Sequence, residues 1–104
     1  MIVLEDLGNQ YGYEKLAPTV STGITKSIYK PTSGIYKGQL ARAVLVGVET
    51  HSIRFREDGG TPDATEGMLI AASNYHTIVN PENIINFRCI DCSGASSVKI
   101  LAYF

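Results

Sequence analysis

Two cysteines and two histidines are the side chains of this 104-residue chain best suited to chemistry. Cys89 and Cys92 form a Cys-x-x-Cys pattern, which occurs in metal and redox sites. A structural zinc site usually needs two such pairs; the sequence has one, and the spacing of His51 and His76 does not complete it. On an extended strand, the two Cα atoms would lie roughly 10 Å apart, whereas a disulfide needs less than about 7 Å. We therefore predict a core thiol at Cys89, a turn thiol at Cys92, no metal and no cofactor.

Acid–base chemistry has a second set of candidates, Glu49 and His51, which an extended segment would point to the same side. No serine or cysteine lies in a recognisable nucleophile motif. The paired carboxylates Glu57 and Asp58 fall in a turn, where such groups are usually solvated or bonded to local backbone N–H groups. We predict no catalytic residue and no enzyme activity, an interpretation that a polar pocket holding His51 or His76 would reverse.

Residues 41–62 carry the clearest strand pattern. Apolar residues alternate with others along two runs, Val44, Val46 and Val48 in the first, then Ile53 and Phe55 in the second. The two runs are out of phase, because the first uses even and the second odd positions. A straight strand cannot absorb such a shift, so we expect a bend near residues 49–52. The sequence DGGTP at residues 58–62 then predicts a chain reversal.

The remaining chain predicts further short strands joined by turns. We expect an extended segment at residues 19–29, apolar strands at 67–73 and 76–79, a strand placing Ile85, Phe87 and Cys89 on one face, and a last strand at 97–104. Pro81 predicts a type I turn or one helical turn. About seven short strands indicate an all-β antiparallel β-sandwich, with immunoglobulin-like and jelly-roll-like topologies both open. Residues 19–104 are expected to form this single domain.

Residues 1–18 are interpreted as an irregular N-terminal arm, because apolar residues mix with glycines and charges without a period. Tyrosines are enriched at interfaces. Ile2, Leu4, Tyr11 and Tyr13 are candidate contacts with a neighbouring subunit. A terminal strand or loop packed on its own domain is the favoured interpretation of these residues, and an arm that reaches a neighbouring subunit is the alternative.

Arg54, Arg56 and Arg88 are predicted to lie together on one exposed sheet face, with Glu49, Glu57 or Glu66 as cross-strand partners. Two interpretations stay open. The first is ordinary ion pairing on a solvated sheet, and the second is a subunit interface in which guanidinium groups meet carboxylates of a neighbour.

Composition narrows the classes of partner. Nine basic and ten acidic residues give a net charge of −1, so we expect no nucleic-acid partner. No apolar run reaches the roughly 18 to 20 residues of a membrane span. The N-terminus MIVLEDLGNQ has no signal-peptide apolar region, so we expect synthesis in a cytoplasm without export and reduced cysteines.

The chain from residue 41 to 104 resembles a group of small phage virion proteins. The resemblance rests on ARAVLVGVETHSIRFREDGGTPDATEGMLI, the INFRCI segment and the closing VKILAYF. The residues that carry it are Glu49, Ile53, Arg54, Phe55, Arg56, Asp58, Gly59, Pro62, Gly67, Phe87 and Arg88. It implies a non-enzymatic β-sandwich on the exterior of a phage capsid, made in the host cytoplasm. It also implies a decoration or cement protein, with a homotrimer and the major capsid protein as partners. Gly60 and the two cysteines depart from the pattern.

A second likeness concerns IRFREDGGTPDATEG, which is similar to a strand–DG–TP turn in sandwich domains appended to chitin- and hexosamine-cleaving enzymes. It implies the alternative function, a carbohydrate-binding or adhesion module of a phage tail or head fibre. Sugar sites on sandwiches usually use exposed aromatic platforms. The chain has no Trp and six Tyr.

Overall fold

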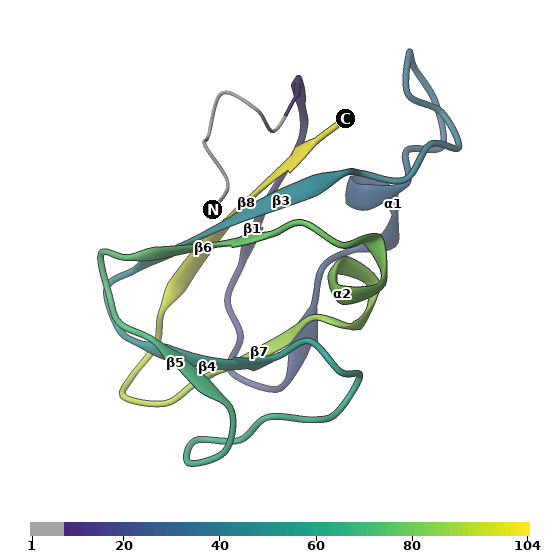
Figure 1. Cartoon of the computed structure of the whole chain (residues 1–104). Helices are drawn as coiled ribbons and strands as arrows, with labels where there is room; N and C mark the ends of the chain where they lie inside the picture. Colours follow the sequence, from purple (N-terminus) through teal and green to yellow (C-terminus); the bar gives the residue numbers. More distant parts are fainter. Residues whose placement is uncertain (1–7) are drawn as a thin grey trace.

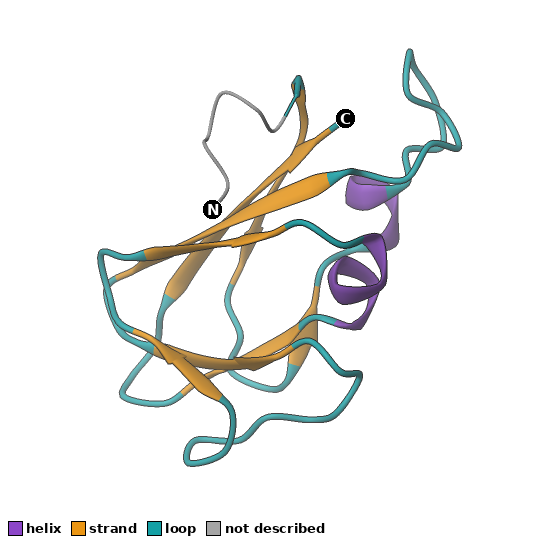
Figure 2. Cartoon of the chain, in the orientation of Figure 1, coloured by secondary structure: helices purple, strands orange, loops and turns teal. Residues whose placement is uncertain are grey.

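Two four-stranded antiparallel sheets pack face to face in the computed structural model, which describes residues 8–104 (Figures 1 and 2). Both helices lie at one end of the sandwich (Figure 2). The all-β sandwich prediction is confirmed. In chain order the elements are β1 (Gln10–Leu16), β2 (Thr22–Gly23), α1 (Lys26–Tyr29), β3 (Ala43–Glu49), β4 (Ile53–Arg56), β5 (Met68–Ile70), β6 (Tyr75–Ile78), α2 (Pro81–Asn86), β7 (Arg88–Asp91) and β8 (Ser97–Tyr103).

The first sheet has the strand order β1-β8-β3-β6, and the second has the order β2-β7-β4-β5. Only β4 and β5 are neighbours both in sequence and in a sheet, so the predicted reversal after Phe55 forms the only hairpin of the described strands. Every other strand-to-strand connection crosses to the opposite sheet. Each sheet is therefore assembled from distant parts of the chain.

The bend predicted at residues 49–52 is confirmed, and it carries the chain from the first sheet to the second. Strand β3 ends at Glu49 and β4 begins at Ile53. Between them Thr50 has φ 75°, a left-handed conformation that is uncommon for residues other than glycine. This turn resolves the phase shift, because both apolar runs can then face the same core.

The core lies between the sheets. Val44, Val46 and Val48 are buried from the first sheet, as predicted, and Ile53 and Phe55 face them from the second. Phe87 is completely buried, and its ring stacks on Phe55 at a centroid distance of 5.7 Å. Cys89 is also fully buried, while Cys92 is partly exposed in the turn after β7, and both thiols are free. The predicted placement of the two cysteines is confirmed.

The helical turn expected at Pro81 is confirmed, although α2 is longer than one turn. The side-chain oxygen of Asn80 accepts a hydrogen bond from the Glu82 backbone N–H at 2.8 Å, and Pro81 occupies the first turn. Because α2 continues to Asn86, the expected strand face of Ile85, Phe87 and Cys89 is wrong for Ile85, which is 45% exposed on the helix.

The extended segment predicted at residues 19–29 is wrong over most of its length. Only Thr22 and Gly23 form a strand, and α1 follows at once. The side chain of Glu14 accepts hydrogen bonds from the backbone N–H of Thr25, at 3.0 Å, and from its hydroxyl group. This contact joins residues eleven positions apart and fixes the chain just before α1. A local pattern of Ser and Thr does not reveal it.

The prediction of a terminal strand packed on its own domain is confirmed for β1, which pairs with β8, and the description of this stretch as an irregular arm is wrong. A register shift between Gln10 and Gly12 interrupts the alternation that identifies a strand. Gly12 also permits close packing, since a Cβ there would lie 2.7 Å from the Ile28 carbonyl oxygen. Leu16 is buried in the core. Ile2 and Leu4 lie outside the described residues.

Candidate interaction surface

The outer face of the first sheet carries a row of side chains that crosses all four strands. The pairings Tyr13↔Leu101, Leu101↔Leu45 and Leu45↔Thr77 place one residue of each strand in this row. Tyr13 is 54% exposed, and the two leucines keep partial exposure. Neither helix covers this face, because both lie at the end of the sandwich (Figure 2). We call this row the tyrosine–leucine row.

A shallow hollow of about 300 Å³ adjoins the tyrosine–leucine row. Gly47 forms its floor, since it pairs with Lys99 on one side and with Tyr75 on the other and has no side chain to fill the space between them. Tyr75 is 63% exposed. The polar side chains of Glu49, Asn74 and Lys99 line the hollow, so an aromatic ring stands beside hydrogen-bonding groups.

The two tyrosines predicted as contact residues have different roles. Tyr13 lies in the tyrosine–leucine row. Tyr11 packs edge-on against Tyr36 and Phe104, at centroid distances of 5.2 and 6.0 Å, and so helps to hold the C-terminal residue against the 30–42 loop. Tyr13 is thus available to a partner, whereas Tyr11 makes internal packing contacts.

The three predicted arginines do share the outer face of the second sheet, because Arg56 pairs with Arg88 and Arg54 occupies the same face two residues earlier. Their guanidinium groups are occupied within the chain. Arg54 donates to the carbonyl oxygens of Ala64 and Gly67, at 3.1 and 3.0 Å. Arg88 donates to the hydroxyl and carbonyl oxygens of Ser21, at 2.8 Å each. These contacts anchor loops to the sheet.

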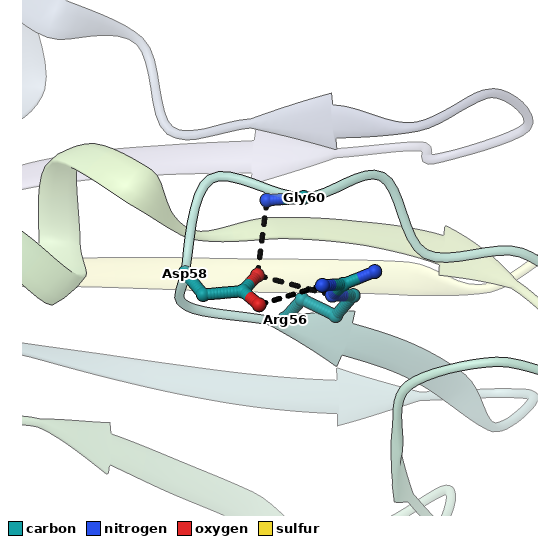
Figure 3. A network of polar contacts seen from close by, with 3 residues as sticks. All are labelled: Arg56, Asp58 and Gly60. Atoms are coloured by element: carbon teal, nitrogen blue, oxygen red, sulfur yellow. Dashed lines mark hydrogen bonds and ion pairs between the residues drawn. The ribbon is translucent and has the colours of Figure 1, made fainter.

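The third arginine, Arg56, is also bonded within the chain, as Figure 3 shows. Its Nε and Nη2 atoms donate to the two carboxylate oxygens of Asp58, at 3.0 and 2.6 Å, and the Gly60 backbone N–H donates to the same carboxylate at 2.9 Å. The Arg56 hydrogen bond, followed by the Gly60 N–H, lowers the pKa of Asp58 to about 2. The network shapes the turn that begins the β4–β5 hairpin.

The cross-strand partners predicted for the arginines are wrong. Glu49 pairs with Lys99 across the first sheet at 2.7 Å, and Glu57 pairs with His76 at 2.6 Å. Glu66 makes no ion pair with another residue of 8–104 within 4 Å. The bend at residues 49–52 explains the first difference, because it leaves Glu49 on the first sheet, away from Arg54 and Arg56.

Four residues of the exposed face were not among the predicted contacts: Leu45, Tyr75, Leu101 and Tyr103. All four occupy outward positions of their strands, and the inward positions of these strands are apolar except for His76. Large apolar side chains at such positions are the signal that identifies an interaction face, because a solvated face usually carries polar residues there.

The described residues assemble little that supports chemistry. Among them, no group of three His, Cys, Asp or Glu side chains is placed to hold a metal ion. Burial, followed by the charge of Asp91, raises the pKa of Cys89 to about 12, so its thiol is not a nucleophile. Besides the hollow over Gly47, two larger hollows of about 520 and 530 Å³ open elsewhere, and His51 and His76 line none of the three.

Within residues 8–104 no helix has the length and apolar character needed to cross a bilayer. Comparison of the chain with protein-family models, with curated proteins and with solved structures finds no match.

Proposed function

We propose that this chain is a structural protein of a phage particle, a decoration or cement protein that binds the exterior of the assembled capsid and stabilises it. The proposed partners are further copies of the chain, as a homotrimer, and the major capsid protein. The proposal gives the chain no enzymatic role. It rests on the resemblance of residues 41–104 to small virion proteins and is compatible with the β-sandwich.

The uncovered tyrosine–leucine row is the observation that carries the proposal. Tyrosine supplies a large apolar area together with a polar hydroxyl, and is over-represented among residues that dominate binding energy. Exposed apolar side chains rarely form continuous patches on monomeric proteins unless they bind something. We assign the capsid contact to this face, with Tyr13 and Tyr75 at its two edge strands.

Co-sedimentation with assembled capsids of the phage that encodes the chain tests the proposal. Wild-type protein is expected to sediment with the capsids and to raise the temperature at which they break. Replacing both exposed rings, Tyr13→Ser with Tyr75→Ser, is expected to weaken capsid binding by roughly 30-fold or more. Leu69→Ser is the matched control, because Leu69 is an exposed apolar residue on the outer face of the second sheet.

Two results would contradict the capsid role: absence of wild-type protein from the capsid pellet, or equal binding by the double variant and the control. The gene neighbourhood gives a further check. A major capsid gene directly beside this one supports a head protein, whereas fibre genes there support the alternative below.

The alternative is a carbohydrate-binding or adhesion module of a phage tail or head fibre. The hollow over Gly47 favours it, because Tyr75 offers a ring to a sugar face and Glu49, Asn74 and Lys99 offer hydrogen bonds to hydroxyl groups. A glycan array is then expected to give a hit that disappears with Tyr75→Ala. A blank array for the wild-type chain removes this alternative.

A further inference from the structure

The 30–42 loop projects from the sandwich beyond α1, at the upper right of Figure 1, and carries an exposed apolar residue. Ile35 is 81% exposed, more than any other large apolar side chain of residues 8–104. A single exposed apolar side chain is common on protein surfaces and makes no contribution to the core. A partner that covers this loop would remove the Ile35 side chain from water.

Lysines flank the projecting loop. Lys26, Lys30 and Lys37 line a hollow of about 530 Å³ at its base, together with hydroxyl groups and no carboxylate. None of the three lysines forms an ion pair with a carboxylate of residues 8–104. The loop therefore presents an apolar residue with uncompensated positive charge around it, and it suits an acidic surface with an apolar centre.

A surface of this description exists on the same chain, beside the 57–67 loop. A hollow of about 520 Å³ has the apolar side chains of Phe55 and Met68 in its wall, and the carboxylates of Glu57, Asp58 and Glu66 also line it. Met68 is strongly exposed. We call this site the acidic hollow.

The three carboxylates of the acidic hollow differ in whether they already form an ion pair. Asp58 is occupied by the Arg56 guanidinium, and Glu57 is paired with His76. Glu66 has no ion-pair partner among the described residues. Asn83 of α2 lines the same hollow, and its side chain makes no hydrogen bond with residues 8–104. Glu66 is thus the carboxylate best placed to receive a lysine from outside.

We propose that the 30–42 loop of one copy docks in the acidic hollow of the next copy. Ile35 packs against the exposed side chain of Met68, and the flanking lysines face Glu66. This contact deepens the proposed function, because it rests on the self-association proposed there and names the surfaces that make it. The tyrosine–leucine row stays free for the capsid.

The contact joins unlike surfaces, so it is a head-to-tail interface. Figure 1 shows the 30–42 loop and the 57–67 loop at different ends of the molecule, the first at the upper right and the second at the bottom. A copy that offers its loop to one neighbour still has its hollow open to another. Repetition of such a contact gives a closed ring when the rotation between copies closes, and the proposed homotrimer is the smallest ring of this kind.

Sedimentation velocity of the full chain, without capsids, measures the contact directly. Ile35→Ser is expected to weaken self-association by roughly 30-fold, the effect of removing a residue that dominates an interface. Val20→Ser is the matched control, since Val20 is also strongly exposed but lines neither the acidic hollow nor the lysine-lined hollow. Wild-type association is expected to weaken as salt screens the lysine–glutamate attraction.

Charge exchange identifies the partner as a second copy. Lys30→Glu with Lys37→Glu gives a chain whose loop and hollow are both acidic, and Glu66→Lys with Asn83→Lys gives a chain in which both are basic. Each is expected to lose self-association, and the two are expected to associate when mixed. A chain with all four substitutions is expected to self-associate again, because its acidic loop meets a basic hollow.

Three results would overturn the contact: a wild-type chain that stays monomeric, self-association that Ile35→Ser leaves intact, or a four-substitution chain that stays monomeric. Failure of the capsid role is separate. Loss of capsid binding with normal self-association contradicts the proposed function alone, and normal capsid binding by an Ile35→Ser chain that still self-associates contradicts only the head-to-tail contact.

Discussion

The two sheets of this sandwich differ in the length of their strands and in the contacts of their outward side chains. In the first sheet β1, β3 and β8 each span seven residues and pair along their length, so backbone hydrogen bonds define it. The second sheet has strands of two to four residues. There the arginines of β4 and β7 donate side-chain hydrogen bonds to loop carbonyl groups. These bonds tie loops to a sheet that has few backbone hydrogen bonds of its own.

This difference also shows in the outward side chains of the two sheets. In the first sheet the backbone hydrogen bonds join the strands, and the outward tyrosine and leucine side chains stay at least partly exposed. On the second sheet the outward arginines are used for the architecture, and each is bonded to a loop of its own chain. The three arginines that the sequence offers as interface candidates are therefore occupied by contacts within the fold, whereas Tyr13 stays exposed.

The largest effects should come from the core that both sheets share. Ile100 on β8 and Ile53 on β4 are completely buried, one in each sheet. Ile100→Ala and Ile53→Ala are each expected to lower the free energy of unfolding by about 2–5 kcal/mol, because each leaves a cavity. Urea denaturation followed by circular dichroism measures both changes.

Ile85→Ala is the matched control for this pair, since it makes the same chemical change at an exposed position of α2. It is expected to change the free energy of unfolding by less than about 0.5 kcal/mol. If Ile53→Ala resembled this control while Ile100→Ala did not, the short-stranded sheet would not share one cooperative core with the other.

The next largest effect should come from an arginine of the second sheet. Arg88→Met keeps much of the apolar stem but removes both hydrogen bonds to Ser21. The variant is expected to lose about 1–2 kcal/mol of unfolding free energy, since hydrogen bonds from charged donors exceed neutral ones in strength. Urea denaturation again gives the measurement. An unchanged midpoint would show that the guanidinium contacts do not hold this sheet together.

The Arg56–Asp58 pair should give the second sheet a pH dependence. The pKa of Asp58 is lowered from 3.8 to about 2 by the Arg56 hydrogen bond and the Gly60 N–H. A carboxyl group with a lowered folded-state pKa stabilises the fold above its unfolded pKa, and that contribution is lost as pH falls through the folded value. The melting temperature of Asp58→Asn should therefore lie below that of the wild type above pH 4, and this gap should shrink as pH falls from 4 to 2. A gap that stays constant over this range would exclude the linkage.

Strands β3 to β8 were largely predictable from the sequence, whereas β1 and β2 were not. Strands β3 and β8 alternate without interruption, and residue type alone identified their buried faces. Alternation of apolar residues does not predict β1, because the irregularity between Gln10 and Gly12 breaks its period. The prediction of an extended segment at residues 19–29 is wrong because the carboxylate of Glu14, eleven positions earlier, fixes Thr25.

The candidate site was less predictable than the fold, since side-chain availability depends on tertiary contacts. The sequence placed the three arginines on one face correctly, but their carbonyl partners in Ala64, Gly67 and Ser21 follow from loop paths. Tyr13 was identified by residue type. Its neighbours in the row come from strands far away in the chain, and only the register brings Leu101 and Leu45 beside it.

The smallest effect is expected from the ion pair of the first sheet. Lys99 donates to Glu49 at 2.7 Å, and the hydrogen bond to Lys99 lowers the pKa of Glu49. Both groups face solvent, where water and salt screen the attraction, so such pairs contribute little to stability. In urea denaturation Lys99→Met should therefore shift the midpoint far less than Arg88→Met, although both substitutions remove one positive charge and leave an apolar side chain. Repeating the measurement at high salt should abolish the small difference between Lys99→Met and the wild type. A shift as large as that of Arg88→Met would mean that the long-stranded sheet also depends on its outward side chains, and the contrast between the two sheets would not hold.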